Sequence, residues 1–159
     1  KAVNAEIDRL LNIKGKRSVD SIHKELGHIM WEYVGMGRTA EGLKEGLKKM
    51  HELEKEFDTN LFVPGKKEGL NVELDKAIHL RDFFTMGELV AFDALSRNES
   101  CGGHSREEYQ TEEGEAKRDD ENYFYVGCWE YKGKGNEPEL IKEPLEYEAI
   151  KVQTRNYKN

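Results

Sequence analysis

Apolar residues at three- and four-residue spacing dominate the first 95 residues, and this periodicity constrains the fold more than any other feature. Four stretches carry the pattern: residues 3–13, 19–33, 43–57 and 71–95. Each places its apolar side chains on one face of an α-helix. Ser18 and Thr39 stand where N-caps are expected, and Gly15 and Gly35 follow the first two stretches. Three long amphipathic helices with short connections predict a mainly α fold, an antiparallel three-helix bundle of the spectrin-repeat kind with a short leading helix.

The fourth stretch is the longest, and it is predicted to supply the third long helix of the bundle. Its apolar residues are predicted to face the core at Leu74, Ile78, Phe84, Leu89, Phe92 and Leu95.

The sequence changes character after residue 96. Residues 96–122 are polar and rich in glycine and glutamate, and they precede aromatic residues of strand type at Tyr123, Tyr125, Trp129 and Tyr131. A turn at residues 132–136 is predicted to return the chain, so that residues 140–141 and 145–147 form the partner strand. Because a two-stranded ribbon is marginal by itself, we expect it to pack on the bundle or on another domain. We therefore predict one domain over residues 1–159, with the bundle at 1–96 and a loop, a β-ribbon and a tail at 97–159.

The net charge of −7 is concentrated in one segment. Eight acidic residues lie between positions 107 and 121 against two basic ones, as in a solvated acidic loop. Phosphate-backbone binding needs clustered lysine and arginine, so no nucleic acid partner is expected. No apolar run approaches the roughly 20 residues that a membrane helix needs, so no direct membrane insertion is expected. The two cysteines fit a reducing compartment, and the first residue, Lys1, suggests an excised piece.

Two motif-like features are weak. Gly35, Gly37 and Ala40 match a relaxed dinucleotide fingerprint, but a predicted helix precedes them where that motif needs a strand, which favours a turn between helices. His23 and His28 are five residues apart, whereas a helical zinc pair needs a spacing of four to share one face. No metal site is expected.

Cys101 and His104 suggest a thiol–imidazole pair in a glycine-rich turn. Nucleophilic catalysis would need the imidazole within hydrogen-bond reach of the thiol, together with an orienting group and an oxyanion site. The sequence does not place the two side chains, so a structural turn is the preferred interpretation.

The segment that starts at Arg97 reads Arg-Asn-Glu-Ser-Cys-Gly-Gly-His-Ser-Arg-Glu, and an Arg-Asp-Asp-Glu sequence follows at residue 118. Together they resemble the signature near the end of succinate dehydrogenase and fumarate reductase flavoproteins, which is Arg-x-Glu-Ser-Arg-Gly-x-His-x-Arg with a later Asp-Asp pair. The upstream helices, with Arg38 between two of them, are similar to the bundle helices of that family. The signature residues implied to lie at a domain interface are Arg38, Arg97, Glu99, Ser100, Cys101, Gly102, Gly103, His104, Arg106, Asp119 and Asp120.

The resemblance implies FAD in the complete subunit, bound by a domain upstream of this chain. None of the flavin, substrate or proton-delivery motifs of the family occurs here, so no catalytic or cofactor-binding residue is expected, and the isolated chain is expected to be inactive. The implied partners are the FAD-binding domain of the same subunit, an iron–sulfur subunit and, indirectly, a membrane anchor. The implied location is cytoplasmic, at the inner face of the bacterial cytoplasmic membrane. The resemblance leaves open whether the parent enzyme oxidises succinate or reduces fumarate.

The paired charges of the signature, with Gly102 and Gly103 allowing close backbone approach, lead to a docking hypothesis. We expect these residues to fix the bundle against the flavin domain, with Asp119 and Asp120 either pairing with arginines or capping local turns. Cys101 departs from the family, which has arginine there, and a thiol cannot replace a bidentate cation. That departure disfavours the related L-aspartate oxidases. Two other interpretations stay open, a free-standing helical interaction module and a small thiol- or metal-dependent enzyme.

Overall fold

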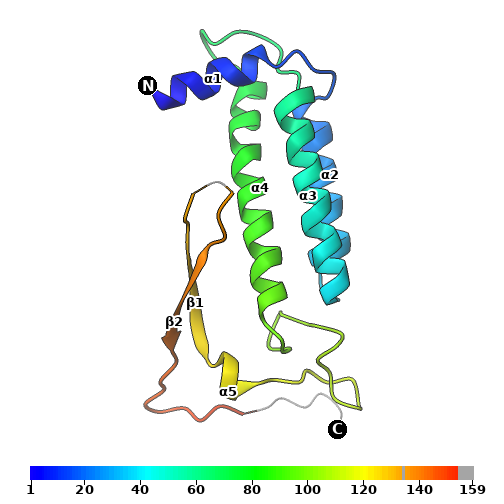
Figure 1. The fold of residues 1–159 in the computed structure, drawn as a ribbon, viewed down its shortest axis with the longest axis vertical. Helices are drawn as coiled ribbons and strands as arrows, with labels where there is room; N and C mark the ends of the chain where they lie inside the picture. Colours follow the sequence, from blue (N-terminus) through cyan, green and yellow to red (C-terminus); the bar gives the residue numbers. More distant parts are fainter. Residues whose placement is uncertain (134, 154–159) are drawn as a thin grey trace.

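The computed structural model describes residues 1–133 and 135–153, and this part of the chain is mainly α-helical (Figure 1). The elements, in chain order, are α1 (Ala2–Asn12), α2 (Val19–Val34), α3 (Ala40–Asn60), α4 (Val72–Ser96), α5 (Asp120–Tyr123), β1 (Tyr125–Glu130) and β2 (Glu139–Pro144). Helices α2, α3 and α4 pack side by side and alternate in direction, and α1 crosses one end of the group (Figure 1). The predicted antiparallel three-helix bundle with a leading helix and a C-terminal ribbon is confirmed.

Local side chains fix where the long helices begin. The Ser18 side chain accepts a hydrogen bond from the Ser21 N–H, and Thr39 accepts one from the Gly42 N–H. Asn71 caps α4 in the same way. These contacts satisfy backbone donors that the first turn of a helix leaves open, which explains why the predicted boundaries hold.

The apolar faces of α2, α3 and α4 form one continuous core, which includes Ile22, Leu26, Leu43, Met50, Leu53, Phe57, Leu80 and Phe84. Within this core the rings of Phe57 and Phe84 lie 5.8 Å apart. The apolar stripes predicted for α2 and α3 lie in this core or pack against it.

The inward face predicted for α4 is partly wrong. Leu89 and Phe92 lie outside the bundle core, and the Phe92 ring packs edge-on against Trp129 of β1 at 5.1 Å. Small residues contribute to the buried face of α4, namely Ala77, Gly87, Ala91 and Ala94. The error arose because α4 carries apolar side chains on more than one face, so spacing alone does not identify the face that meets the bundle.

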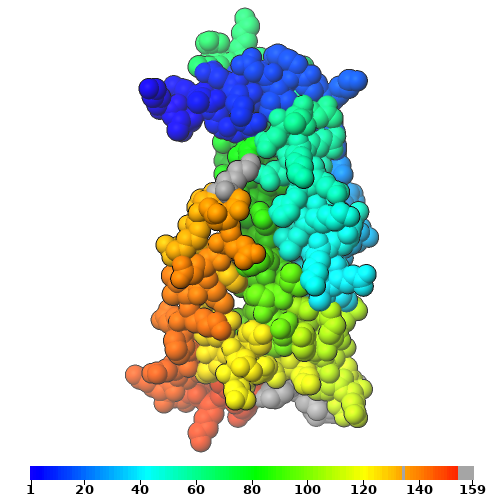
Figure 2. All heavy atoms as spheres, in the orientation of Figure 1, coloured from blue at the N-terminus to red at the C-terminus, as the bar shows by residue number. Residues whose placement is uncertain are grey.

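The ribbon packs along α4 and is antiparallel, with Cys128 opposite Ile141 (Figures 1 and 2). The Trp129 Nε1–H donates to the Asp93 carboxylate of α4 at 2.7 Å, which attaches the ribbon to the bundle. The returning strand includes residues 140–141 as predicted, but residues 145–147 lie beyond it. The chain just before β1 forms the short helix α5, which takes Tyr123 out of the predicted strand, and beyond β2 the Leu145 N–H donates to the Phe124 carbonyl at 3.3 Å. Position 134 in the predicted turn lies outside the described residues.

In residues 1–133 and 135–153, no helix combines the length and the apolar character needed to cross a membrane.

Candidate functional site

The signature loop, residues 97–108, lies under the end of the bundle where α2 ends, α3 begins and α4 ends (Figure 1). Backbone hydrogen bonds join it to the turn between α2 and α3. The Arg38 N–H donates to the Ser105 carbonyl at 3.1 Å, and the Glu107 N–H donates to the Arg38 carbonyl at 2.8 Å. Two segments far apart in the sequence are therefore held together at one end of the bundle.

We call the contact between the signature loop and the ends of α2, α3 and α4 the junction. Arg106 is its central cation and is 2% exposed. Its Nη1 donates to the carbonyls of Ala94, Leu95 and Arg97, at 3.1, 3.4 and 3.3 Å. These carbonyls lie at the C-terminal end of α4, where backbone acceptors lack partners within the helix and a positive charge is favourable. Arg106 therefore caps α4 from a later part of the chain.

Glu99 and Ser100 are also almost fully buried, at 2% and 1% exposure. The Glu99 carboxylate pairs with the Arg97 guanidinium and accepts the Asp119 N–H at 3.0 Å. The Ser100 hydroxyl accepts the Arg106 N–H at 2.8 Å and donates to the Arg106 carbonyl at 3.1 Å. The polar atoms of both side chains are thus satisfied within the chain, as burial requires.

His104 bridges the loop and the α2–α3 turn. Its Nδ1 lies 2.9 Å from Arg38 Nη1, and its Nε2 lies 3.1 Å from the Arg97 carbonyl oxygen. Because a guanidinium only donates and a carbonyl only accepts, the geometry assigns the proton to Nε2 and leaves Nδ1 as the acceptor. Burial lowers the pKa of His104; the carbonyl acts to raise it, and the charges of Arg38, Arg106 and Arg97 lower it further. The ring is therefore neutral at pH 7.

Arg38 also holds the end of α2. Its Nε donates to the carbonyls of Val34 and Gly35, at 3.1 and 3.0 Å. Burial lowers the pKa of Arg38, but a guanidinium stays charged at neutral pH. One arginine thus connects the C-terminal end of α2 to the imidazole of the signature loop.

Glu108 is a member of the junction that sequence reasoning missed. Its carboxylate accepts the Ala40 N–H in the first turn of α3 and pairs with Arg106 Nε at 3.1 Å. Burial acts to raise the pKa of Glu108, but the Ala40 N–H, its own backbone N–H and Arg106 together lower it. Nothing in the local sequence indicates this contact, because the two ends are 68 residues apart in the chain.

The Asp-Asp pair lies beside the loop and has two separate roles. Asp119 caps α5 by accepting the Asn122 N–H, while its own N–H binds Glu99. Asp120 pairs with Arg118 at 2.6 Å. Asp119 therefore caps a local turn and Asp120 pairs with an arginine, so the structure contains both of the arrangements weighed from the sequence.

Cys101 and His104 are paired through their backbones and not through their side chains. The Cys101 N–H donates to the His104 carbonyl at 2.9 Å, and the His104 N–H returns to the Cys101 carbonyl at 3.0 Å. Gly102 closes this turn at a φ of 58°, which glycine adopts without steric cost. Both nitrogens of the imidazole are occupied by Arg38 and Arg97, so the ring does not serve as a base for the thiol.

The turn between α2 and α3 does not fit a dinucleotide, and the described residues do not form a metal site. The fingerprint glycines lie in the turn between α2 and α3, and the first turn of α3 already holds Thr39 and the Glu108 carboxylate. A pyrophosphate there would meet a negative charge where the fingerprint needs free N–H groups. Within residues 1–133 and 135–153, no group of three histidine, cysteine or acidic side chains is arranged to hold a metal ion.

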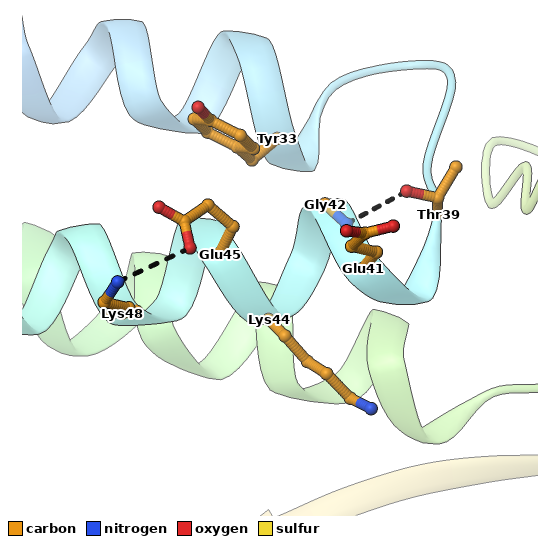
Figure 3. A pocket seen from close by; sticks show the side chains of 7 residues that line it. All are labelled: Tyr33, Thr39, Glu41, Gly42, Lys44, Glu45 and Lys48. Atoms are coloured by element: carbon orange, nitrogen blue, oxygen red, sulfur yellow. Dashed lines mark hydrogen bonds and ion pairs between the residues drawn. The ribbon is translucent and has the colours of Figure 1, made fainter.

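A surface depression lies over the start of α3 (Figure 3). It is lined by Tyr33, Thr39, Glu41, Gly42, Lys44, Glu45 and Lys48. Thr39 is engaged in its cap, Glu45 lies 3.9 Å from Lys48, and Lys44 points away from the other side chains. The polar groups do not converge, so we assign no chemistry to this depression.

Comparison with known proteins identifies the family. Residues 23–157 match the family model described as "Fumarate reductase flavoprotein C-term". The chain belongs to this family. The resemblance to the C-terminal domain of succinate dehydrogenase and fumarate reductase flavoproteins, seen first in the signature residues, is therefore confirmed.

Individual relatives agree with this family. The fumarate reductase flavoprotein subunit of Proteus vulgaris is 28% identical over 150 residues, which is 94% of this chain and 23% of that protein. An L-aspartate oxidase of Nicotiana tabacum is 42% identical over 97 residues, which is 61% of this chain and 15% of that protein. A mutant E. coli quinol fumarate reductase FrdA structure has the same fold, with a TM-score of 0.80 at 24% identity over 96% of this chain and 25% of that one. The family member described here thus spans less than a quarter of these two curated relatives.

Proposed function

We propose that this chain is the C-terminal helical domain of a longer flavoprotein subunit that interconverts succinate and fumarate. A preceding domain of that subunit holds FAD and passes electrons to an iron–sulfur subunit, and a membrane anchor positions the complex at the inner face of the cytoplasmic membrane. The family match over residues 23–157 supports this assignment, as does the alignment with the Proteus fumarate reductase subunit over 94% of the chain. Hydride transfer needs the flavin, so the isolated chain is inactive.

The docking part of the proposal rests on one observation: the buried polar side chains at the junction find their hydrogen-bond partners within the chain. Arg106 and Glu99 are satisfied inside the chain, so they act on docking indirectly, by fixing the positions of the helix ends. The turn at Gly102 and Gly103 is exposed on the loop. We assign docking on the FAD domain to this turn and to the partly exposed Cys101 and Arg38, and we assign the positioning of that turn to the buried residues.

The test uses the complete subunit with Glu99→Ala and His104→Ala. Each variant removes a contact that holds the loop, and each is expected to lower the FAD content per polypeptide and the yield of co-purified iron–sulfur subunit. Glu107→Ala is the matched control, because this neighbouring side chain is exposed and the variant keeps the backbone N–H that donates to the Arg38 carbonyl. Unchanged flavin content and assembly in both test variants would refute the docking role.

A second candidate is an L-aspartate oxidase, favoured by the 42% identity over 97 residues. The fumarate reductase alignment covers more of the chain, 150 residues, and for this reason we place it first. Dye reduction by the complete subunit separates the two functions. The rate is measured on one preparation with succinate and then with L-aspartate, so that only the substrate differs. Activity with L-aspartate and none with succinate would replace the first proposal.

The gene supplies a further check on the alternative of a free-standing helical module. A reading frame that encodes a flavin-binding segment ahead of residue 1 supports the proposal. A frame without such a segment would favour the interaction module.

A further inference from the structure

Asp93 lies in the last turn of α4, where a negative charge is locally unfavourable. The C-terminal end of a helix carries the negative end of its dipole, and α4 has no basic residue of its own in that turn. Such exceptions to local preference are expected at functional or strained sites. The contacts of Asp93 therefore indicate what this end of the helix holds in place.

The first contact of Asp93 is with the ribbon. The Trp129 Nε1–H donates to its carboxylate at 2.7 Å, and the Trp129 ring packs edge-on against Phe92 at 5.1 Å. A hydrogen bond to a charged acceptor is stronger than one between neutral groups. Because a two-stranded ribbon is marginal by itself, the position of β1 on α4 depends on contacts of this kind.

The charge of Asp93 also reaches two arginines of the junction. Burial acts to lower the pKa of Arg97, while Glu99, Tyr125 and Asp93 together raise it. Burial lowers the pKa of Arg38, and the Asp93 charge opposes this effect. One carboxylate therefore interacts with the ribbon, with the first residue of the signature loop and with the arginine that joins the loop to α2.

The start of the ribbon contacts one of these arginines directly. The Arg97 guanidinium lies 5.5 Å from the centre of the Tyr123 ring and 5.4 Å from that of Tyr125, and it donates to the Tyr123 carbonyl at 2.9 Å. Tyr125 and Trp129 are four residues apart in β1, so they lie on the same face of the strand. That face therefore has two anchors, Tyr125 on Arg97 and Trp129 on Asp93.

Arg97 connects these anchors to the buried part of the signature loop. It pairs with Glu99, which is 2% exposed and also accepts the Asp119 N–H at 3.0 Å. Asp119 in turn caps α5, the short helix that leads into β1. The loop thus meets the start of the ribbon twice, through Arg97 and through Asp119.

We propose that the ribbon, when it lies on α4, holds the signature loop in its docking conformation, and that Asp93 and Trp129 are the positioning residues of this device. The inference deepens the proposed function, and its consequence for flavin retention rests on that function. Separation of Trp129 from Asp93 frees one anchor of β1, which loosens the second anchor on Arg97 and lets the loop open. Both residues act on the docking turn through Arg97 and Glu99.

Hydrogen exchange in the complete subunit, measured by mass spectrometry, reports on the ribbon and the loop together. Trp129→Phe keeps an aromatic ring beside Phe92 and removes the N–H donor. It is expected to speed exchange about tenfold in peptides of β1 and to a similar extent in peptides of residues 97–108. Faster exchange in β1 with no change in the loop would overturn the proposal, because the ribbon would then move without the loop. No change in either segment would also overturn it, because the contact would then not hold the ribbon.

Substitutions of Asp93 test its role as the acceptor. Asp93→Ala is expected to reproduce the faster loop exchange, whereas Asp93→Asn keeps an oxygen for the Trp129 N–H and should restore most of the protection. Asp82→Asn is the matched control, because it makes the same change on an exposed residue of the same helix, and it should leave loop exchange unchanged. Equal exchange in Asp93→Ala and Asp93→Asn would mean that Asp93 does not position Trp129 as a hydrogen-bond acceptor.

Flavin content of the same preparations separates this inference from the proposed function. A complete parent subunit without flavin would contradict the proposed function, whereas the exchange result for the loop does not depend on flavin. In a flavin-containing parent, Trp129→Phe is expected to speed flavin loss severalfold and Asp82→Asn to leave the rate unchanged. Flavin loss at the parent rate in Trp129→Phe, despite faster loop exchange, would show that the held loop does not serve docking.

Discussion

The bundle and the junction beneath it are stabilised by different kinds of contact. In the core, Phe57 and its neighbours are apolar, and their packing contacts are numerous and require no specific partner atom. In the junction, Glu99, Ser100 and Arg106 are equally buried but polar, and each has specific partners. A core residue can be lost with partial collapse of its neighbours, whereas a lost junction residue leaves a buried donor or acceptor unsatisfied. The core therefore supplies most of the stability, and the junction fixes the geometry of the helix ends.

The substitution with the largest expected effect tests whether the apolar core supplies most of the stability. Phe57→Ala should lower the free energy of unfolding by about 3–5 kcal/mol, because it removes a fully buried ring and leaves a cavity. Phe62, which is 47% exposed, is the control, and Phe62→Ala should cost far less. Urea unfolding followed by circular dichroism measures both. Similar losses in the two variants would mean that the core is not the main source of stability.

The next effect tests the junction. Glu99→Ala leaves Arg97 and the Asp119 N–H without their acceptor, and it should cost about 1–3 kcal/mol. Glu99→Gln keeps the shape and one acceptor, so part of that stability should return. The same urea titrations give both values, with Glu107→Ala as the exposed control. If glutamine is no better than alanine, the specific acceptor contacts do not carry the role of Glu99.

Sequence predicted those parts of the fold that depend on neighbours along the chain. Ser18 and Thr39 cap helices where the pattern placed them, because an N-cap involves residues only three apart. The face of α4 was harder to predict. Phe92 is apolar like the core residues, and only the later strand β1, with Trp129, determines that it packs on the ribbon.

The candidate site shows the same limit. The signature residues were found through resemblance, but their partners were not. The contact between Glu108 and Ala40, and the capping of α4 by Arg106, join segments that meet only after the chain has folded. Burial also separates residues that the sequence grouped together, since Glu99 faces inward while Gly102 and Gly103 face solvent.

Two glycines of the bundle differ in the space around them: Gly46 is tightly packed and Gly27 is not. A Cβ at Gly46 would lie 2.7 Å from Tyr33 Cβ, so Gly46→Ala forces α2 and α3 apart and should destabilise by roughly 1 kcal/mol after its gain in helix propensity. Gly27 has open space, so Gly27→Ala should stabilise by about 0.5–1 kcal/mol. Thermal unfolding gives both signs. A Gly46→Ala variant as stable as Gly27→Ala would contradict the close approach of the two helices.

The smallest effect is a pH dependence confined to the junction. Because burial and the neighbouring arginines lower the pKa of His104 in the folded chain, the unfolded chain, with a pKa of about 6.5, takes up the proton first as pH falls. The stability contributed by the neutral ring is thus fully present above about pH 6.5 and is lost as pH falls through the folded pKa. Protonation also places an N–H at Nδ1, facing the Arg38 donor. Acid should therefore weaken the junction while the apolar core is unaffected.

His104→Asn tests this assignment, because the amide oxygen can accept from Arg38 and does not titrate. Urea midpoints of the parent and the variant should differ by a constant amount above about pH 6.5, and the advantage of the parent should shrink toward lower pH. The other histidines are present in both proteins, so their titration cancels in the difference. A difference that does not change between pH 7.5 and the acid range would mean that the ring is not held neutral between Arg38 and the Arg97 carbonyl.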